Sequence, residues 1–200
     1  MFRVFTHPGD AIKIAKKVGS TGTSIGVLAL SALIFAIVSV IGTTQFMALF
    51  PGTIPYTAGV STGVAAVITF LMIFIGGLFF GWILHLVMNV LGTKSSYFAG
   101  ITTIAYPLML LSVANLVAVG AGYIPFIGGI IAFLIVLIFT CMSFALTYRA
   151  IKELFKTDMI TAFIGLIVVW SAIIAAGLYG GLAGMLSTVG RLPIYGFLGL

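Results

Sequence analysis

The sequence predicts an all-α fold: a polytopic transmembrane helical bundle of about five spans with a short amphipathic N-terminal interfacial helix. Composition is the first reason, since 62% of the 200 residues are hydrophobic and only 6% are charged. Soluble domains carry about 25% charged residues. The second reason is that residues 95–148 contain no charged side chain, although one spanning helix needs only about 20 apolar residues. That run therefore holds two crossings.

The first 22 residues are expected to form a cytosolic N-terminus with a surface helix. From Pro8 to about Val18, the apolar residues recur at helical spacing on one face, and three lysines occupy the other face. Such a helix lies along a membrane with its apolar side down. The same lysines could instead simply orient the first span. The sequence alone leaves both interpretations open.

Residues 23–184 are expected to form a five-span transmembrane domain, and residues 185–200 a short external tail. Each predicted span is an apolar run with almost no charge, and the turns between the spans contain glycine, proline or charged residues. The five predicted spans are Ser24–Thr44, Val60–Leu91, Phe98–Val119, Ile124–Tyr148 and Met159–Leu182. Residues 148–158 are expected to extend the fourth span, with Thr157 or Asp158 capping the fifth.

Charge placement supports an odd number of crossings. If the N-terminus is cytoplasmic, eight of the nine basic residues fall on the inner side and only Arg191 falls outside. This bias is the positive-inside pattern, and it places the C-terminus outside. The basic residues also predict anionic membrane lipids as partners, rather than nucleic acid. The residues predicted to contact lipid headgroups are Lys13, Lys16, Lys17, Lys94, Arg149, Lys152 and Lys156.

A few polar residues and one proline inside the predicted spans are candidates for a pocket. Polar groups in a bilayer are costly and often functional. His85 and Asn89 share a helix face in span two. His85 could serve proton transfer or headgroup binding, or it could simply snorkel or bond a neighbouring backbone. Tyr106 and Pro107 could kink or break span three, with Asn115 two turns further on. These five residues form either a polar pocket between spans two and three or separate packing devices.

Small residues at helical spacing predict close helix packing. Ladders of this kind let two backbones approach each other and drive association in lipid. They could pack within the chain or against a partner, including a second copy. The residues concerned are Ala172, Ala176, Gly180 and Gly184 on span five, and Gly77 and Gly81 on span two.

No complete catalytic or metal-binding site is predicted from the sequence. No aspartate pair lies within a predicted span, and all three acids lie in the predicted inner loops: Asp10, Glu153 and Asp158. No second histidine, cysteine or carboxylate is spaced to complete a metal site with His85. We therefore expect a protein that is not an enzyme and has no cofactor.

Four segments resemble the Yip (Ypt-interacting protein) domain family of small five-span membrane proteins. They are T-H-P-G-D-A-I at residues 6–12, L-H-L-V-M-N-V-L-G-T-K-S-S-Y-F at 84–98, I-A-Y-P-L at 104–108 and T-D-M-I-T-A at 157–162. The resemblance implies a role in membrane organisation or trafficking. Gly92-Thr93 stands where the family usually has two glycines, and a D-L-Y-G-P-like motif and the long N-terminal region of eukaryotic members are missing. The chain therefore resembles a prokaryotic-type member, which argues against small GTPase binding.

We predict a non-enzymatic scaffold that acts through protein and lipid contacts in the cell membrane of a prokaryote. The alternative is a small transporter, channel or lipid-handling protein that uses the polar pocket. The position of the candidate residues distinguishes the two: convergence of His85, Asn89, Tyr106, Pro107 and Asn115 on one cavity would favour transport. Their separation would favour the scaffold.

Overall fold

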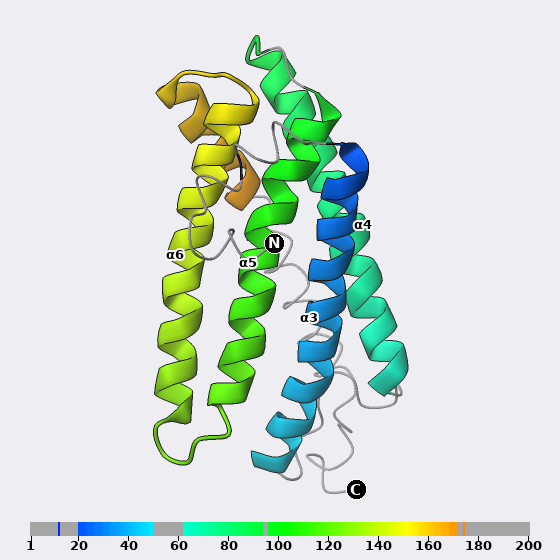
Figure 1. The fold of residues 1–200 in the computed structure, drawn as a ribbon, viewed down its shortest axis with the longest axis vertical. Coiled ribbons are helices and arrows are strands. Elements are labelled where there is room, and N and C mark those ends of the chain that lie inside the picture. Colours follow the sequence, from blue (N-terminus) through cyan, green and yellow to red (C-terminus); the bar gives the residue numbers. More distant parts are fainter. Residues whose placement is uncertain (1–11, 13–19, 50–61, 94–95, 172–173, 175–200) are drawn as a thin grey trace, which may run out of the picture.

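The computed structural model describes residues 12, 20–49, 62–93, 96–171 and 174. Four long helices run side by side in it: α3 (Thr21–Leu49), α4 (Thr62–Val90), α5 (Tyr97–Ala121) and α6 (Gly128–Leu154). A shorter apolar helix, Met159–Ser171, follows α6 (Figure 1). The described part of the chain is helical and contains no strand. The predicted all-α membrane bundle is confirmed.

The first four predicted spans correspond to α3, α4, α5 and α6, each long and apolar enough to cross a bilayer. Their ends differ from the predicted ones by several residues. α6 begins at Gly128 rather than Ile124, and it continues beyond Tyr148 to Leu154, as the amphipathic pattern of that loop predicts. For the fifth span, the structure describes Met159–Ser171 and Ile174, and the remaining predicted residues lie outside the described part.

α5 is the central helix of the bundle and packs against α3, α4 and α6 (Figure 1). Its buried face is rich in small residues, including Ala99, Gly100, Ala105 and Ala114. Because lipid tails are as apolar as leucine, the hydrophobic effect does not hold such helices together, and close backbone contact does so instead. Small side chains on α5 permit that contact with three neighbours at once.

The crossing of α4 and α5 depends on a pair of glycines. A Cβ atom added to Gly100 would overlap the carbonyl oxygen of Gly81, and one added to Gly81 would lie 3.1 Å from the backbone of Ile101. One turn earlier on α4, a Cβ atom on Gly77 would lie 2.5 Å from the side chain of Leu28 on α3. Gly77 and Gly81 therefore pack within the chain.

A buried apolar cluster joins the last helix to the rest of the bundle. Leu84 and Met88 of α4 meet Ile151 of α6 and Ala162 and Val169 of the Met159–Ser171 helix. Asp158 caps the start of this helix. Its carboxylate accepts hydrogen bonds from the N–H groups of Ile160 at 3.1 Å and Thr161 at 3.3 Å. The predicted helix cap at Asp158 is confirmed.

Ile12 is the one described residue of the predicted N-terminal surface helix. It is fully buried and packs against Leu110 of α5 and Leu146 and Ala150 of α6. At this residue the N-terminal segment contacts the bundle. The rest of the predicted helix lies outside the described residues.

Candidate functional site

His85 and Asn89 lie together in the last turns of α4. Nδ2 of Asn89 is 3.3 Å from Nε2 of His85, as their i, i+4 spacing allows. Asn89 is exposed and His85 is half-buried. A Cβ atom added to Gly100, close to the start of α5, would lie 3.5 Å from Cβ of His85. The pair therefore belongs to one end of the bundle.

Tyr106 and Pro107 lie further along α5. Tyr106 is half-buried and packs against two apolar clusters, one shared with α3 and one shared with α6. α5 continues through Pro107 without ending, so the predicted break does not occur there. Pro107 has no N–H to donate to the preceding turn. Its own carbonyl accepts a hydrogen bond from Ser143 of α6 at 3.4 Å.

Asn115 forms a hydrogen bond within its own helix. Its Nδ2 donates to the carbonyl of Leu111 at 2.8 Å, so the amide is partly satisfied without a neighbouring helix. Asn115 is fifteen positions after Gly100, about 22 Å along the axis at the α-helical rise. The structure thus brings His85 and Asn89 together and leaves Tyr106, Pro107 and Asn115 at other levels of the bundle.

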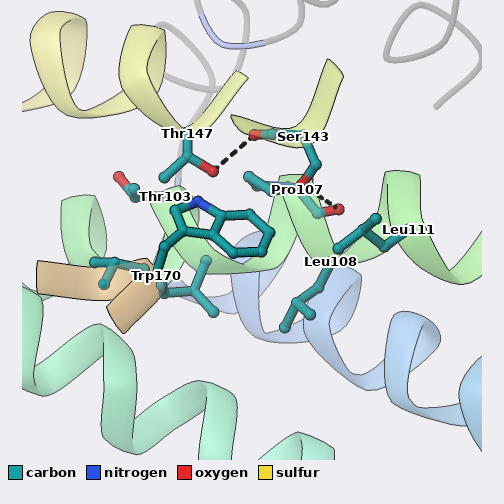
Figure 2. A pocket seen from close by; sticks show the side chains of 9 residues that line it. Thr103, Pro107, Leu108, Leu111, Ser143, Thr147 and Trp170 are labelled. Atoms are coloured by element: carbon teal, nitrogen blue, oxygen red, sulfur yellow. Dashed lines mark hydrogen bonds between the residues drawn. The ribbon is translucent and has the colours of Figure 1, made fainter. Parts of the chain in front are cut away.

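A small cavity of about 40 Å³ lies where α5, α6 and the last helix meet (Figure 2). By volume it holds no more than a few water molecules, whereas pockets for drug-sized ligands occupy about 300–1,000 Å³. Of the five candidate residues, Pro107 lines it. The other lining residues are Thr103, Ile104, Leu108, Leu111, Ser143, Thr147, Val169 and Trp170.

The hydroxyl groups around this cavity donate to backbone carbonyls. Thr103 donates to Ala99 at 2.8 Å and Thr147 donates to Ser143 at 2.8 Å, each within its own helix. Figure 2 shows the indole nitrogen of Trp170 on the side of the ring toward Thr103 and Thr147. Its Nε1 is buried and has no acceptor among the described residues. The ring stacks on Phe144 with 3.8 Å between the centroids.

Sequence reasoning missed this cluster of hydroxyl groups and one indole. One signal was present: Ser143 and Thr147 are four residues apart, so they share a face of α6. Trp170 was not predictable in the same way, because its depth in the bundle depends on how the last helix docks.

Of the predicted small-residue positions, the structure describes only the two on α4. Gly77 and Gly81 contact α3 and α5, as given above. The span-five members, Ala172, Ala176, Gly180 and Gly184, lie outside the described residues. Among the described residues of the last helix, Gly165 is also closely packed, since a Cβ atom there would lie 3.1 Å from the sulfur of Met88.

A basic hollow of about 430 Å³ lies where α6 ends. Arg149, Lys152 and Lys156 line it with their side chains exposed, and Glu153 contributes a carboxylate. Tyr148 and Thr157 complete the lining. The other predicted headgroup contacts, Lys13, Lys16, Lys17 and Lys94, lie outside the described residues.

Apolar helices of spanning length, packed around a central helix rich in small residues, define a polytopic integral membrane protein. The chain belongs to the Yip1 domain family, because the family model of the Yip1 domain matches residues 2–181. The family resemblance seen in the sequence is confirmed. Comparisons with curated proteins and with solved structures give no match.

Proposed function

We propose that this Yip1 domain protein is a non-enzymatic membrane organiser or trafficking-type scaffold. It acts through contacts with other membrane proteins and with anionic lipids. In the proposed topology the N-terminus is cytoplasmic, the C-terminus is outside, and the membrane is the cell membrane of a prokaryote. Small GTPase binding forms no part of this proposal.

The observation that carries the proposal is the separation of the candidate polar residues. His85 and Asn89 lie at one end of α4, whereas Asn115 lies about 22 Å further along α5 and bonds its own helix. Only Pro107 of the five lines the internal cavity, whose volume is about 40 Å³. This arrangement favours a packed bundle over the alternative of a transporter, channel or lipid-handling protein with a polar pocket between spans two and three.

The predicted partner surface is the small-residue ladder of span five. A leucine at two ladder positions would separate the backbones that the small residues allow to meet. We expect crosslinking of the intact protein in its own membrane to capture a reproducible protein partner, or a second copy. Gly180→Leu with Gly184→Leu should remove that product.

The matched control is Ser171→Leu with Ala175→Leu, which adds two bulky side chains on the opposite side of the same predicted helix. It should leave the crosslinked product in place. A wild-type protein that captures no membrane protein and instead protects a small solute would contradict the scaffold. Equal loss in both variants would contradict the assignment of the ladder as the contact surface.

A further inference from the structure

The basic hollow at the end of α6 has the composition of an anion site. It is lined by Tyr148, Arg149, Lys152, Glu153, Lys156 and Thr157. Three cations and one carboxylate leave a net charge of +2. Arg149 supplies a planar fork of N–H donors, and the two lysines supply point charges. Two hydroxyl groups add further donors, so the chemistry suits phosphate oxygens.

The backbone fixes the positions of these cations. Ala150 and Ile151 are fully buried on the opposite face of α6, and Phe155 is 2% exposed in the apolar cluster below the turn. Lys156 adopts a left-handed conformation with φ of 50°, which turns the chain back toward the next helix. Asp158 directs its carboxylate to the N–H groups of Ile160 and Thr161. The charged side chains are therefore the part of this turn that is left on the surface.

The position of the hollow along α6 indicates which kind of anion it would bind. The apolar part of α6 ends at Tyr148, and the cations follow within the next two turns. Basic residues that directly follow a span lie at the level of lipid headgroups, where anionic lipids attract them. A headgroup with two negative charges would match the net charge of the hollow.

We propose that this hollow binds the headgroup of a phospholipid that carries two negative charges, with Arg149, Lys152 and Lys156 contacting its phosphate oxygens. The inference deepens the proposed function, because it gives the lipid contacts of the scaffold a defined place and a preferred headgroup. Scattered surface charge would instead respond to total lipid charge alone.

Native mass spectrometry of the intact protein tests the proposal after reconstitution with cardiolipin, which has two phosphodiesters. Phosphatidylglycerol at twice the mole fraction matches the charge, and phosphatidylcholine supplies the neutral background. We expect wild-type protein to retain cardiolipin in preference to phosphatidylglycerol. Arg149→Gln with Lys152→Gln should weaken retention about tenfold, since each basic residue near the surface contributes to binding.

Arg3→Gln with Arg191→Gln is the control, because it removes the same charge at positions outside the predicted headgroup contacts and should leave retention unchanged. Helicity by circular dichroism should be equal in all variants, since Arg149 and Lys152 are exposed. Undiminished retention in the Arg149/Lys152 variant would overturn the proposal. Equal loss of cardiolipin in both variants would also overturn it. So would displacement of the lipid by millimolar inorganic phosphate, or crosslinking of the hollow to an acidic protein instead of lipid.

The same variants separate this inference from the proposed function. Crosslinking to a protein partner depends on the span-five ladder, whereas lipid retention depends on the hollow. If the Arg149/Lys152 variant keeps both the partner and the lipid, the lipid site is wrong and the scaffold stands. If wild-type protein retains cardiolipin selectively but captures no protein, the lipid site stands and the scaffold is wrong.

Discussion

At the scale of single residues, Trp170 carries a polar group that the described bundle does not satisfy. Its indole contributes a large apolar surface and stacks on Phe144, but its buried N–H has no acceptor among the described residues. A buried donor without an acceptor costs about 1–3 kcal/mol. The aromatic ring and its N–H group therefore act in opposite directions on stability.

Trp170→Phe keeps an aromatic ring against Phe144 and removes the unsatisfied donor. We expect the melting temperature of the detergent-solubilised protein to be unchanged or raised, because the lost ring area is offset by the removed N–H penalty. Trp82→Phe on the exposed face of α4 is the control and should change little. A clear drop in the melting temperature of the Trp170 variant alone would contradict this expectation, because the penalty of the buried N–H would then be smaller than the packing that the ring contributes.

Asp158 is a second residue whose chemistry is open to a direct test. Hydrogen bonds from the side chain and backbone of Thr161, together with the N–H of Ile160, lower the pKa of this carboxyl group. Because the pKa is lower in the folded protein, the ionised carboxylate of Asp158 stabilises the fold at pH values above its unfolded pKa of about 3.9. This contribution is lost as the pH falls through the pKa of the folded state. The cap of the last helix therefore weakens only in strong acid.

Asp158→Asn separates capping from ionisation, because asparagine caps helices well but does not titrate. Below about pH 4, we expect wild-type protein to lose stability relative to this variant, measured as the difference between their melting temperatures across pH. Near neutral pH the difference should be constant. A difference that is also constant in acid would contradict the role of the ionised cap.

At the scale of the elements, the crossing of α4 and α5 is the closest contact that the described glycines make. Gly100→Ala would place a methyl group on the carbonyl oxygen of Gly81. We expect a loss of about 1–3 kcal/mol in the free energy of unfolding, since an overpacked contact forces backbone shifts. Equilibrium unfolding in mixed detergent micelles measures it.

Gly76→Ala on α4 is the matched control, because a Cβ atom there would meet nothing within 4 Å. Both changes replace a helical glycine by alanine, which favours a helix by up to about 1 kcal/mol. The control should therefore be neutral or stabilising. Equal effects of the two variants would show that the α4–α5 contact does not limit stability.

The elements were largely predictable and their contacts were not. The long apolar runs placed α3, α4, α5 and α6 to within a few residues, because the bilayer sets their length. The amphipathic pattern after Tyr148 also predicted that α6 continues into the basic turn. By contrast, helical spacing placed Gly77 and Gly81 on a packing face without identifying Leu28 and Ile101 as their neighbours. Such neighbours depend on how the helices rotate and dock.

At the scale of the whole molecule, the two ends of α6 lie at opposite ends of the bundle (Figure 1). The hairpin at residues 122–127 joins α5 to α6 at one end, and the basic turn at 155–158 lies at the other. The charge distribution predicts that the basic turn faces the cytoplasm.

Cysteine labelling in intact cells tests that orientation in a Cys141→Ala background. We expect Tyr123→Cys to react with an impermeant maleimide from outside, and Thr157→Cys to react only after the membrane is permeabilised. Both positions lie in turns of the described bundle. The reverse labelling pattern would invert the topology, and external labelling at both positions would show that α6 does not cross the membrane.

The candidate site was less predictable at this scale than the bundle. The i, i+4 spacing correctly predicted that His85 and Asn89 lie together, because both belong to one helix. It could not show that Asn115 bonds the carbonyl of Leu111, or that Trp170 and Ser143 meet at one cavity. The first depends on a rotamer, and the second depends on contacts between residues far apart in the chain.

The central position of α5 has a consequence for biosynthesis. Membrane helices leave the ribosome in chain order, and α3 and α4 emerge before the helix that both of them pack against. Until α5 joins them, the Gly81 surface of α4 lacks the neighbour that it has in the complete bundle. A nascent chain that stalls between α4 and α5 would therefore expose an unfinished contact surface, which is the kind of feature that membrane quality-control proteases could recognise.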